Sequence, residues 1–88
     1  MEILKISSKS NVKKVAGALA NIIRRDNEVE AQTIGAGSLN TLVKSVIVAR
    51  GYLAPSDIDL YMVPSFTDIK INDDEKTAIK IIVKAREK

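Results

Sequence analysis

The stretch IGAGSLNTLVKSVIVARG (residues 34–51) changes from one hydrophobic pattern to another at a pair of glycines. The residues from Val29 to Ile34 are strand-like, and apolar residues after the glycines recur at the spacing of a helix. We therefore predict that residues 35–37 turn a strand directly into a helix, which ends at Gly51 before Pro55. The expected buried stripe of this helix consists of Leu39, Leu42, Val43, Val46 and Ala49.

The flanking segments supply the other elements of the fold. Residues 2–7 are expected to form a short strand, and Ser10 is expected to cap a helix that ends at residues 26–27. From Ile58 onward, alternating residues predict a long hairpin. The resulting order predicts an α/β fold, a two-layer sandwich with two helices on one face of a four-stranded sheet. The expected buried stripe of the first helix consists of Val12, Val15, Ala16, Leu19, Ile22 and Ile23.

The hairpin is expected to turn at a tip formed by residues 72–75. Pairing outward from that tip places Phe66 opposite Ile81 and Met62 opposite Ala85, on the core face. Pro64 cannot donate a backbone hydrogen bond, so it indicates an edge strand or a bulge. On the other face, the same register brings Tyr61 near Arg86 and Val63 near Lys84.

Length and composition restrict the classes of function. The 88 residues fit one domain, and the 45% of hydrophobic residues indicate a globular chain that is not disordered. The chain has no cysteine and no histidine, so it lacks thiolate metal ligands and the commonest general base. We predict no catalysis, no cofactor and no metal site. Without a signal-peptide pattern or a long apolar run, the sequence predicts a cytoplasmic protein that does not enter a membrane.

Charge is distributed unevenly along the chain. The net charge is +3, yet no acid separates the basic residues between Glu2 and Asp26, whereas most acids follow residue 56. Such asymmetry attracts polyanions, although a solvated helix face is an equally simple explanation. The basic residues of this first segment are Lys5, Lys9, Lys13, Lys14, Arg24 and Arg25.

The glycine turn permits three interpretations. A dinucleotide fingerprint requires a third glycine where Asn40 stands, and a larger sheet than this chain can form, so a nucleotide cofactor is disfavoured. The backbone N–H groups of a helix amino terminus attract anions, with Ser38, Asn40 and Lys44 close by. Alternatively, Gly35 and Gly37 only permit the turn.

The loop SSKSN (residues 7–11) is a second candidate for phosphate contacts, because small polar donors surround a lysine there. Combining this loop with the glycine turn gives one predicted footprint for a nucleic-acid backbone. Its residues are Lys9, Lys13, Lys14, Gly35, Gly37, Ser38, Asn40 and Lys44.

Val48 is expected on the polar face of the second helix, beside Thr41, Lys44 and Ser45. An apolar residue on such a face marks an oligomer contact or nothing at all, because singly exposed apolar residues are common. In a domain this small, a partner subunit would add useful burial, which favours the contact. We therefore expect a homodimer.

Several segments resemble the stage V sporulation protein S family. They are VAGALA (15–20), IGAGSLN (34–40), VKSVIVARG (43–51), APSDIDL (54–60), PSFTDI (64–69) and TAIKIIV (77–83). The resemblance covers nearly the whole chain. It implies a small bacterial protein that affects sporulation and cell division, with an Alba-like fold and a mixed sheet.

The resemblance also implies a function, because Alba proteins are dimeric and bind DNA and RNA. Lys9 matches a basic position of their first loop. Where the Alba pattern supplies arginine and lysine after the glycine turn, this chain has Ser38 and Thr41, and the hairpin tip, basic in Alba, is acidic here.

Taken together, the residues and the resemblance predict a non-enzymatic sporulation-regulator homologue that binds DNA or RNA through backbone contacts, with little sequence preference. The alternative is a protein–protein interaction module in sporulation and cell-division control. A third possibility is a small-anion sensor at the glycine turn.

Overall fold

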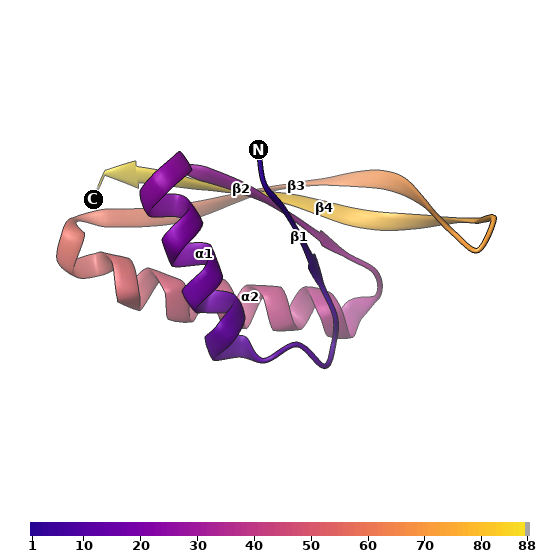
Figure 1. Cartoon of the computed structure of the whole chain (residues 1–88), viewed down its shortest axis with the longest axis horizontal. Helices are drawn as coiled ribbons and strands as arrows, with labels where there is room; N and C mark the ends of the chain where they lie inside the picture. Colours follow the sequence, from indigo (N-terminus) through magenta and orange to yellow (C-terminus); the bar gives the residue numbers. More distant parts are fainter. Residues whose placement is uncertain (88) are drawn as a thin grey trace.

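The computed structural model describes residues 1–87 and shows two helices on one face of a four-stranded mixed sheet (Figure 1). The predicted element order is confirmed. The elements are β1 (Ile3–Ile6), α1 (Val12–Asp26), β2 (Glu28–Thr33), α2 (Ala36–Leu53), β3 (Ile58–Ile71) and β4 (Asp74–Glu87). A 3-10 turn, Ala54–Ser56, joins α2 to β3.

The strands follow the order β1-β2-β4-β3 across the sheet. β1 and β2 are parallel, with Leu4 beside Ala31, and β4 is antiparallel to both of its neighbours. β2 alternates strictly between buried and half-buried residues, so Val29, Ala31 and Thr33 face the helices. Glu28, Glu30 and Gln32 consequently lie on the uncovered face of the sheet.

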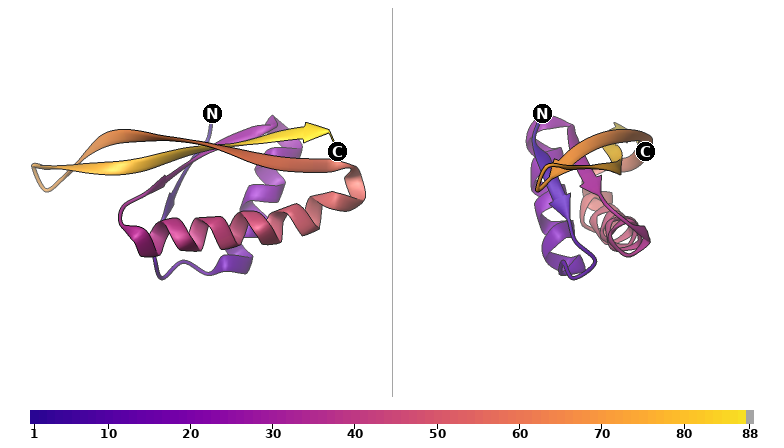
Figure 2. Two further views of the ribbon diagram at one scale, coloured as in Figure 1. Left: turned by 180° about the vertical axis from the view of Figure 1, so that it is seen from behind. Right: turned by 90° about the vertical axis from the view of Figure 1, so that its right-hand side faces the viewer.

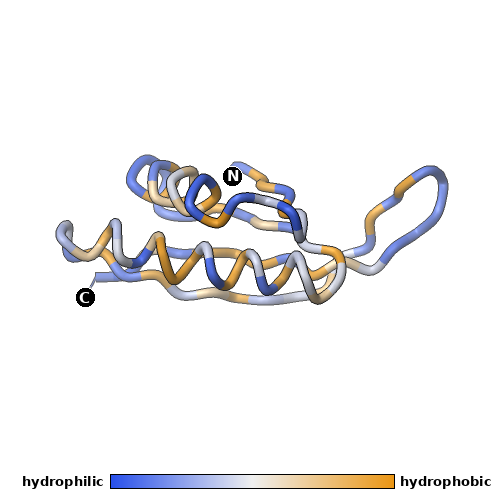
Figure 3. The backbone as a smooth tube through the Cα atoms, turned by 90° about the horizontal axis from the view of Figure 1, so that it is seen from below, coloured by the Kyte–Doolittle hydropathy of each residue, from blue (hydrophilic) through white to orange (hydrophobic). Residues whose placement is uncertain are grey.

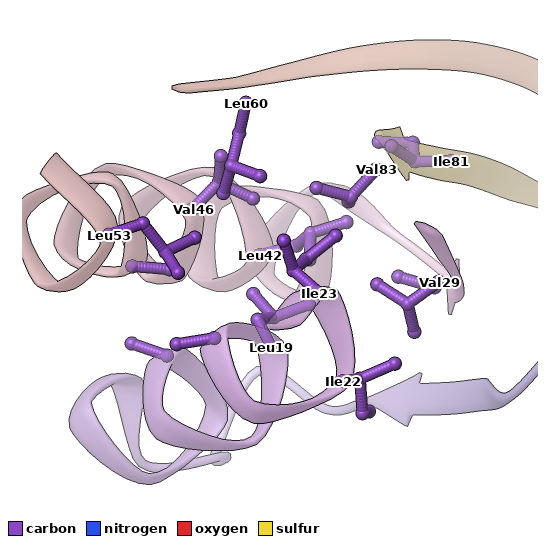
Figure 4. Close-up of a cluster of buried hydrophobic side chains, with 14 of the residues drawn as sticks. Leu19, Ile22, Ile23, Val29, Leu42, Val46, Leu53, Leu60, Ile81 and Val83 are labelled. Atoms are coloured by element: carbon purple, nitrogen blue, oxygen red, sulfur yellow. The ribbon is translucent and has the colours of Figure 1, made fainter. Parts of the chain in front are cut away.

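The core lies between the two helices and the sheet (Figure 4). Leu19 and Ile23 of α1 lie beside Leu42 of α2 in Figure 4. These three side chains and Leu53, farther along α2, are fully buried. The stripe predicted for α1 is confirmed at Ala16, Leu19, Ile22 and Ile23.

Two predicted helix boundaries are wrong. Asn11, not Ser10, caps α1, because its Oδ1 accepts a 3.0 Å hydrogen bond from the backbone N–H of Lys14. α2 does not end at Gly51 but continues to Leu53, whose side chain is fully buried. Burial of Leu53 stabilises these two additional residues and offsets the helical cost of glycine at residue 51.

The predicted polar face of α2 is also partly wrong. Thr41 and Ser45 are buried, because each hydroxyl donates to the carbonyl four residues earlier, at 3.0 and 2.7 Å. Val48 is half-buried and packs against the core, so it is not the free apolar contact that we predicted. The side chains that α2 does expose include Asn40, Lys44 and Ile47.

The hairpin register differs from the prediction by two residues. Asn72 and Asp73, both with positive φ, form a two-residue turn, so Ile71 pairs with Asp74. The prediction was wrong because it assumed a four-residue tip, residues 72–75. Phe66 therefore lies opposite Ile79, Met62 opposite Val83, Tyr61 opposite Lys84 and Val63 opposite Ile82.

The far half of the hairpin is a two-stranded arm, residues 67–78, because β2 pairs with β4 only as far as Ile79 (Figures 1 and 2). It extends beyond the helices and contributes to the 44 Å length of the molecule. Phe66, just before the arm, is 80% exposed rather than part of the core, since no helix covers it. Within residues 1–87, no helix is long and apolar enough to cross a membrane.

Candidate nucleic-acid interface

The loop of residues 7–11 is a tight turn closed by its own serines. The Ser10 N–H donates to the Ser7 carbonyl at 3.1 Å, and the Ser7 N–H donates to Ser10 Oγ at 3.0 Å. The Lys9 N–H donates to Ser7 Oγ at 3.1 Å. This explains why serine stands at residue 10 although it does not cap the helix. The turn presents Lys9 to solvent.

This loop packs directly against the start of α2. A Cβ added to Gly37 would lie 3.0 Å from Cβ of Ser8, and the Thr41 hydroxyl lies 3.4 Å from the Ser8 carbonyl. The two segments lie side by side in Figures 1 and 3. The structure therefore joins the two stretches that the sequence identified separately.

Both glycines have a structural cause that needs no ligand. Gly35 adopts φ 85° and ψ 161°, a region that only glycine occupies readily. Gly37 permits the close approach of Ser8. The simplest interpretation of the glycine turn, a backbone requirement, is therefore sufficient to explain both residues.

Ser38 cannot serve as the side-chain donor that we predicted. Its residue is 3% exposed, and its hydroxyl donates to the carbonyls of Ile34 at 2.7 Å and Gly35 at 3.0 Å. The single hydroxyl proton is thus engaged within the turn, leaving only the backbone N–H for a ligand. Asn40 and Lys44, in contrast, are exposed on successive turns of α2.

The charges at both helix starts favour an anion. α2 has no side-chain cap, and neither helix has an acid in its first turn. Lys13 and Lys14 instead occupy the first turn of α1, where the helix dipole disfavours cations. Phosphate near these residues would offset both effects.

Two arginines of the basic segment have other partners. Arg24 Nη2 donates to the Tyr52 carbonyl at 3.2 Å, which ties α1 to the end of α2. Arg25 pairs with Glu2 at 3.0 Å and with Asp26 at 2.9 Å. Both arginines lie at the far end of α1, away from Lys9.

Sequence reasoning missed a charge cluster at the edge of the sheet. Asp59 is 9% exposed and accepts hydrogen bonds from Arg50 Nε at 2.7 Å and from the Leu60 N–H at 2.9 Å. These bonds lower the pKa of Asp59 to about 2, with a weaker contribution from Arg86, 3.6 Å away. Among residues 1–87, no group of three or more acids is arranged to hold a metal ion.

The order of the elements and the sheet topology are those of an Alba-like fold. The chain is similar to the structure described as Alba from Thermoplasma volcanium, with a TM-score of 0.65 and 11% sequence identity. That similarity covers 98% of this chain and 100% of the other. A family model described as stage V sporulation protein S (SpoVS) matches residues 2–86. The chain belongs to the stage V sporulation protein S family, which confirms the resemblance seen in its sequence motifs.

Proposed function

We propose that this sporulation-family protein binds DNA or RNA through phosphate contacts and catalyses no reaction. The contact between Ser8 and Gly37 carries the proposal, because it joins the Lys9 loop to an uncapped helix start. The proposed interface keeps the predicted residues. Lys9, Lys13, Lys14, Asn40 and Lys44 contribute side chains, and Gly35, Gly37 and Ser38 contribute backbone.

The placement of lysines supports this proposal more strongly than their number does. Lys13 and Lys14 lie in the first turn of α1, where the helix dipole disfavours cations, so helix electrostatics does not explain their position. A bound phosphate would supply the missing negative charge. This arrangement points to an anionic partner for that end of the molecule.

Weak sequence preference follows from the types of contact available. Lysines and backbone N–H groups recognise phosphates, which carry no sequence information directly. The interface contains no arginine and no aromatic residue to read base edges. We therefore expect similar affinity for unrelated sequences and a steep dependence on salt.

The experiment compares Lys9→Ala/Lys13→Ala/Lys14→Ala with Lys76→Ala/Lys80→Ala/Lys84→Ala, which removes the same charge from β4. Binding to duplex DNA, single-stranded DNA and RNA is measured over a salt series. The first variant should lower the slope of log affinity against log salt by about 2 to 3, whereas the control should change it less. Equal loss in both variants would indicate only nonspecific attraction, and no loss in either would remove the proposed interface.

We propose self-association as a second property. β3 is a 14-residue edge strand with an open side, and its Met62 and Phe66 are exposed, as is Ile47 of α2. Exposed apolar residues along an edge support pairing with another chain. We propose this surface as the oligomer contact in place of Val48, because Val48 packs against the core.

The same surface supports the alternative function, a protein–protein interaction module. Phe66, Pro64 and Ile79 border an apolar recess of about 240 Å³. Under that alternative, the chain would bind nucleic acid weakly, with an affinity that does not depend on salt, and would bind a protein partner at this recess. The salt series described above therefore distinguishes the two functions.

A further inference from the structure

A groove of about 400 Å³ lies between the loop after β1 and the hairpin arm. Its volume is within the range of small-molecule sites. Its lining contains two lysines and no acid, although acids are common elsewhere in the arm. The lining residues are Lys5, Ile6, Ser7, Ser8, Gln32, Ile34, Ser38, Ile69, Lys70 and Ile71.

The register of the sheet explains how the groove forms. Lys5, Gln32, Lys80 and Ser65 make one row across the uncovered face. After Ser65, the same face of β3 carries Thr67, Ile69 and Ile71 in turn, because side chains alternate along a strand. The hairpin is twisted, as the crossing of β3 and β4 in Figure 2 shows. Ile69 and Ile71 line the groove together with Ser7, Ser8 and Ile34, which follow β1 and β2.

Isoleucines supply the apolar part of the lining. Ile34, directly after β2, remains 42% exposed and lines the groove opposite the arm. Apolar walls thus face each other across an open slot.

The polar groups around these walls suit a nucleotide. Lys5 provides a cation for phosphate, and Ser7 and Ser8 provide hydroxyls. The side-chain N–H of Gln32 donates to Glu30 Oε2 at 2.8 Å. The amide oxygen of Gln32 is then left as an acceptor for a base edge. Lys70 also lines the groove, but Lys5 lies on β1, which leads directly into the loop with Ser7 and Ser8, so we assign the phosphate to Lys5.

We propose that this groove binds one unpaired nucleotide, with its base between Ile34 and the arm and its phosphate at Lys5. The proposal rests on the proposed function, because Ser38 belongs both to the groove and to the Lys9 interface, and Ser8 of the groove packs on Gly37 of that interface. A strand whose backbone follows that interface can direct one unstacked base into the slot. A base paired in a duplex cannot enter.

The direct test follows the methyl signals of the isoleucines by NMR. Adenosine monophosphate and a single-stranded oligonucleotide are the two ligands, and ribose 5-phosphate is the control without a base. Ring-current shifts should appear at Ile34, Ile69 and Ile71 and not at Ile3 or Ile47. Shifts with both ligands indicate a site for free nucleotides as well, and shifts with the oligonucleotide alone indicate a site for strands. Shifts with neither ligand, or equal shifts with ribose 5-phosphate, overturn the proposal.

A second measurement separates this inference from the proposed function. Ile69→Ser/Ile71→Ser should weaken single-strand binding on the order of tenfold, as expected for loss of one base contact, and leave duplex binding unchanged. Ile3→Ser/Val63→Ser is the matched control on the same face, outside the groove. In one outcome, the triple lysine variant loses nucleic-acid binding while Ile69→Ser/Ile71→Ser binds single strands as wild type does. That result would support the proposed function and contradict the nucleotide site.

Discussion

The Cβ that Gly37 lacks would lie 3.0 Å from Cβ of Ser8, closer than nine in ten contacts of real Cβ atoms. A side chain at this position must shift the backbone at Ser8 by a few tenths of an ångström, because Ser8 Cβ is fixed to that backbone. Gly37→Ala is therefore expected to destabilise the fold by about 1 kcal/mol and to weaken nucleic-acid binding. Urea unfolding and the binding series measure the two effects.

Gly51→Ala is the matched control for that substitution. Gly51 is also helical, but an added Cβ would meet no atom within 4 Å. Alanine should stabilise this position by up to about 1 kcal/mol, because it loses less backbone entropy in a helix. Equal effects of the two substitutions would contradict the close contact between Ser8 and Gly37.

Leu19 is the side chain through which α1 contributes most clearly to the core. It is fully buried, and Leu42 lies close by in Figure 4. Leu19→Ala should cost about 2–5 kcal/mol of unfolding free energy, because the neighbours cannot close the cavity completely. Ile47→Ala, at a residue 60% exposed, should cost less than about 0.5 kcal/mol. A loss at Leu19 no larger than at Ile47 would mean that this core is wrongly placed.

Patterns that repeat over many residues predicted the fold well. The stripe of α1 and the strand-to-helix turn at Gly35 follow from local periodicity and from backbone freedom, so the sequence alone was enough to identify them. Burial of individual polar residues depended on contacts that the sequence pattern does not show. Thr41 and Ser45 look polar but satisfy their hydroxyls within the helix, which allows burial.

The same limit applied to the candidate site. Lys9 and Gly37 were both identified, but only the fold brings their segments together. The groove along the arm depends on the register of the hairpin. The predicted register was shifted by two residues, because the turn was predicted to be two residues too long. The sequence did contain a signal for the shorter turn, because Asn72 and Asp73 are residue types that tolerate the positive φ of a two-residue turn.

Asp59 makes stability depend on pH in the acid range. Its folded pKa, about 2, lies below its ordinary value of 3.8, so its ion pairs with Arg50 stabilise the fold above about pH 4. That contribution is lost as the pH falls from about 4 through about 2. Asp59→Asn should lower the urea midpoint near neutral pH, and the difference from wild type should shrink in acid. Asp57→Asn, at an exposed residue with positive φ, is the control and should change little.

Phe66 tests whether the β3 edge joins two copies of the chain. Phe66→Asp should leave the monomer folded, since the side chain is 80% exposed, and should lower the sedimentation coefficient at micromolar concentrations. Ile3→Asp places the same charge on β1, the opposite edge of the sheet. Unchanged sedimentation of Phe66→Asp, or a monomeric wild type, would contradict assembly through β3.

The acidic turn of the arm provides a last test of the nucleic-acid interface. Asp73, Asp74 and Glu75 lie at the far end of the arm, whereas Lys9 and Lys13 lie beside the helix starts (Figure 1). If phosphates bind at the lysines, these acids contact none of them and act by repulsion alone, although Asp74 pairs with Ile71 of the groove. Salt screens that repulsion. Asp73→Asn/Asp74→Asn/Glu75→Gln should therefore leave binding unchanged, or strengthen it a few-fold at low salt with no gain at high salt. Asparagine keeps the positive φ of Asp73 accessible, so the turn should survive. Weaker binding by this variant would place the arm tip, rather than Lys9, against the nucleic acid.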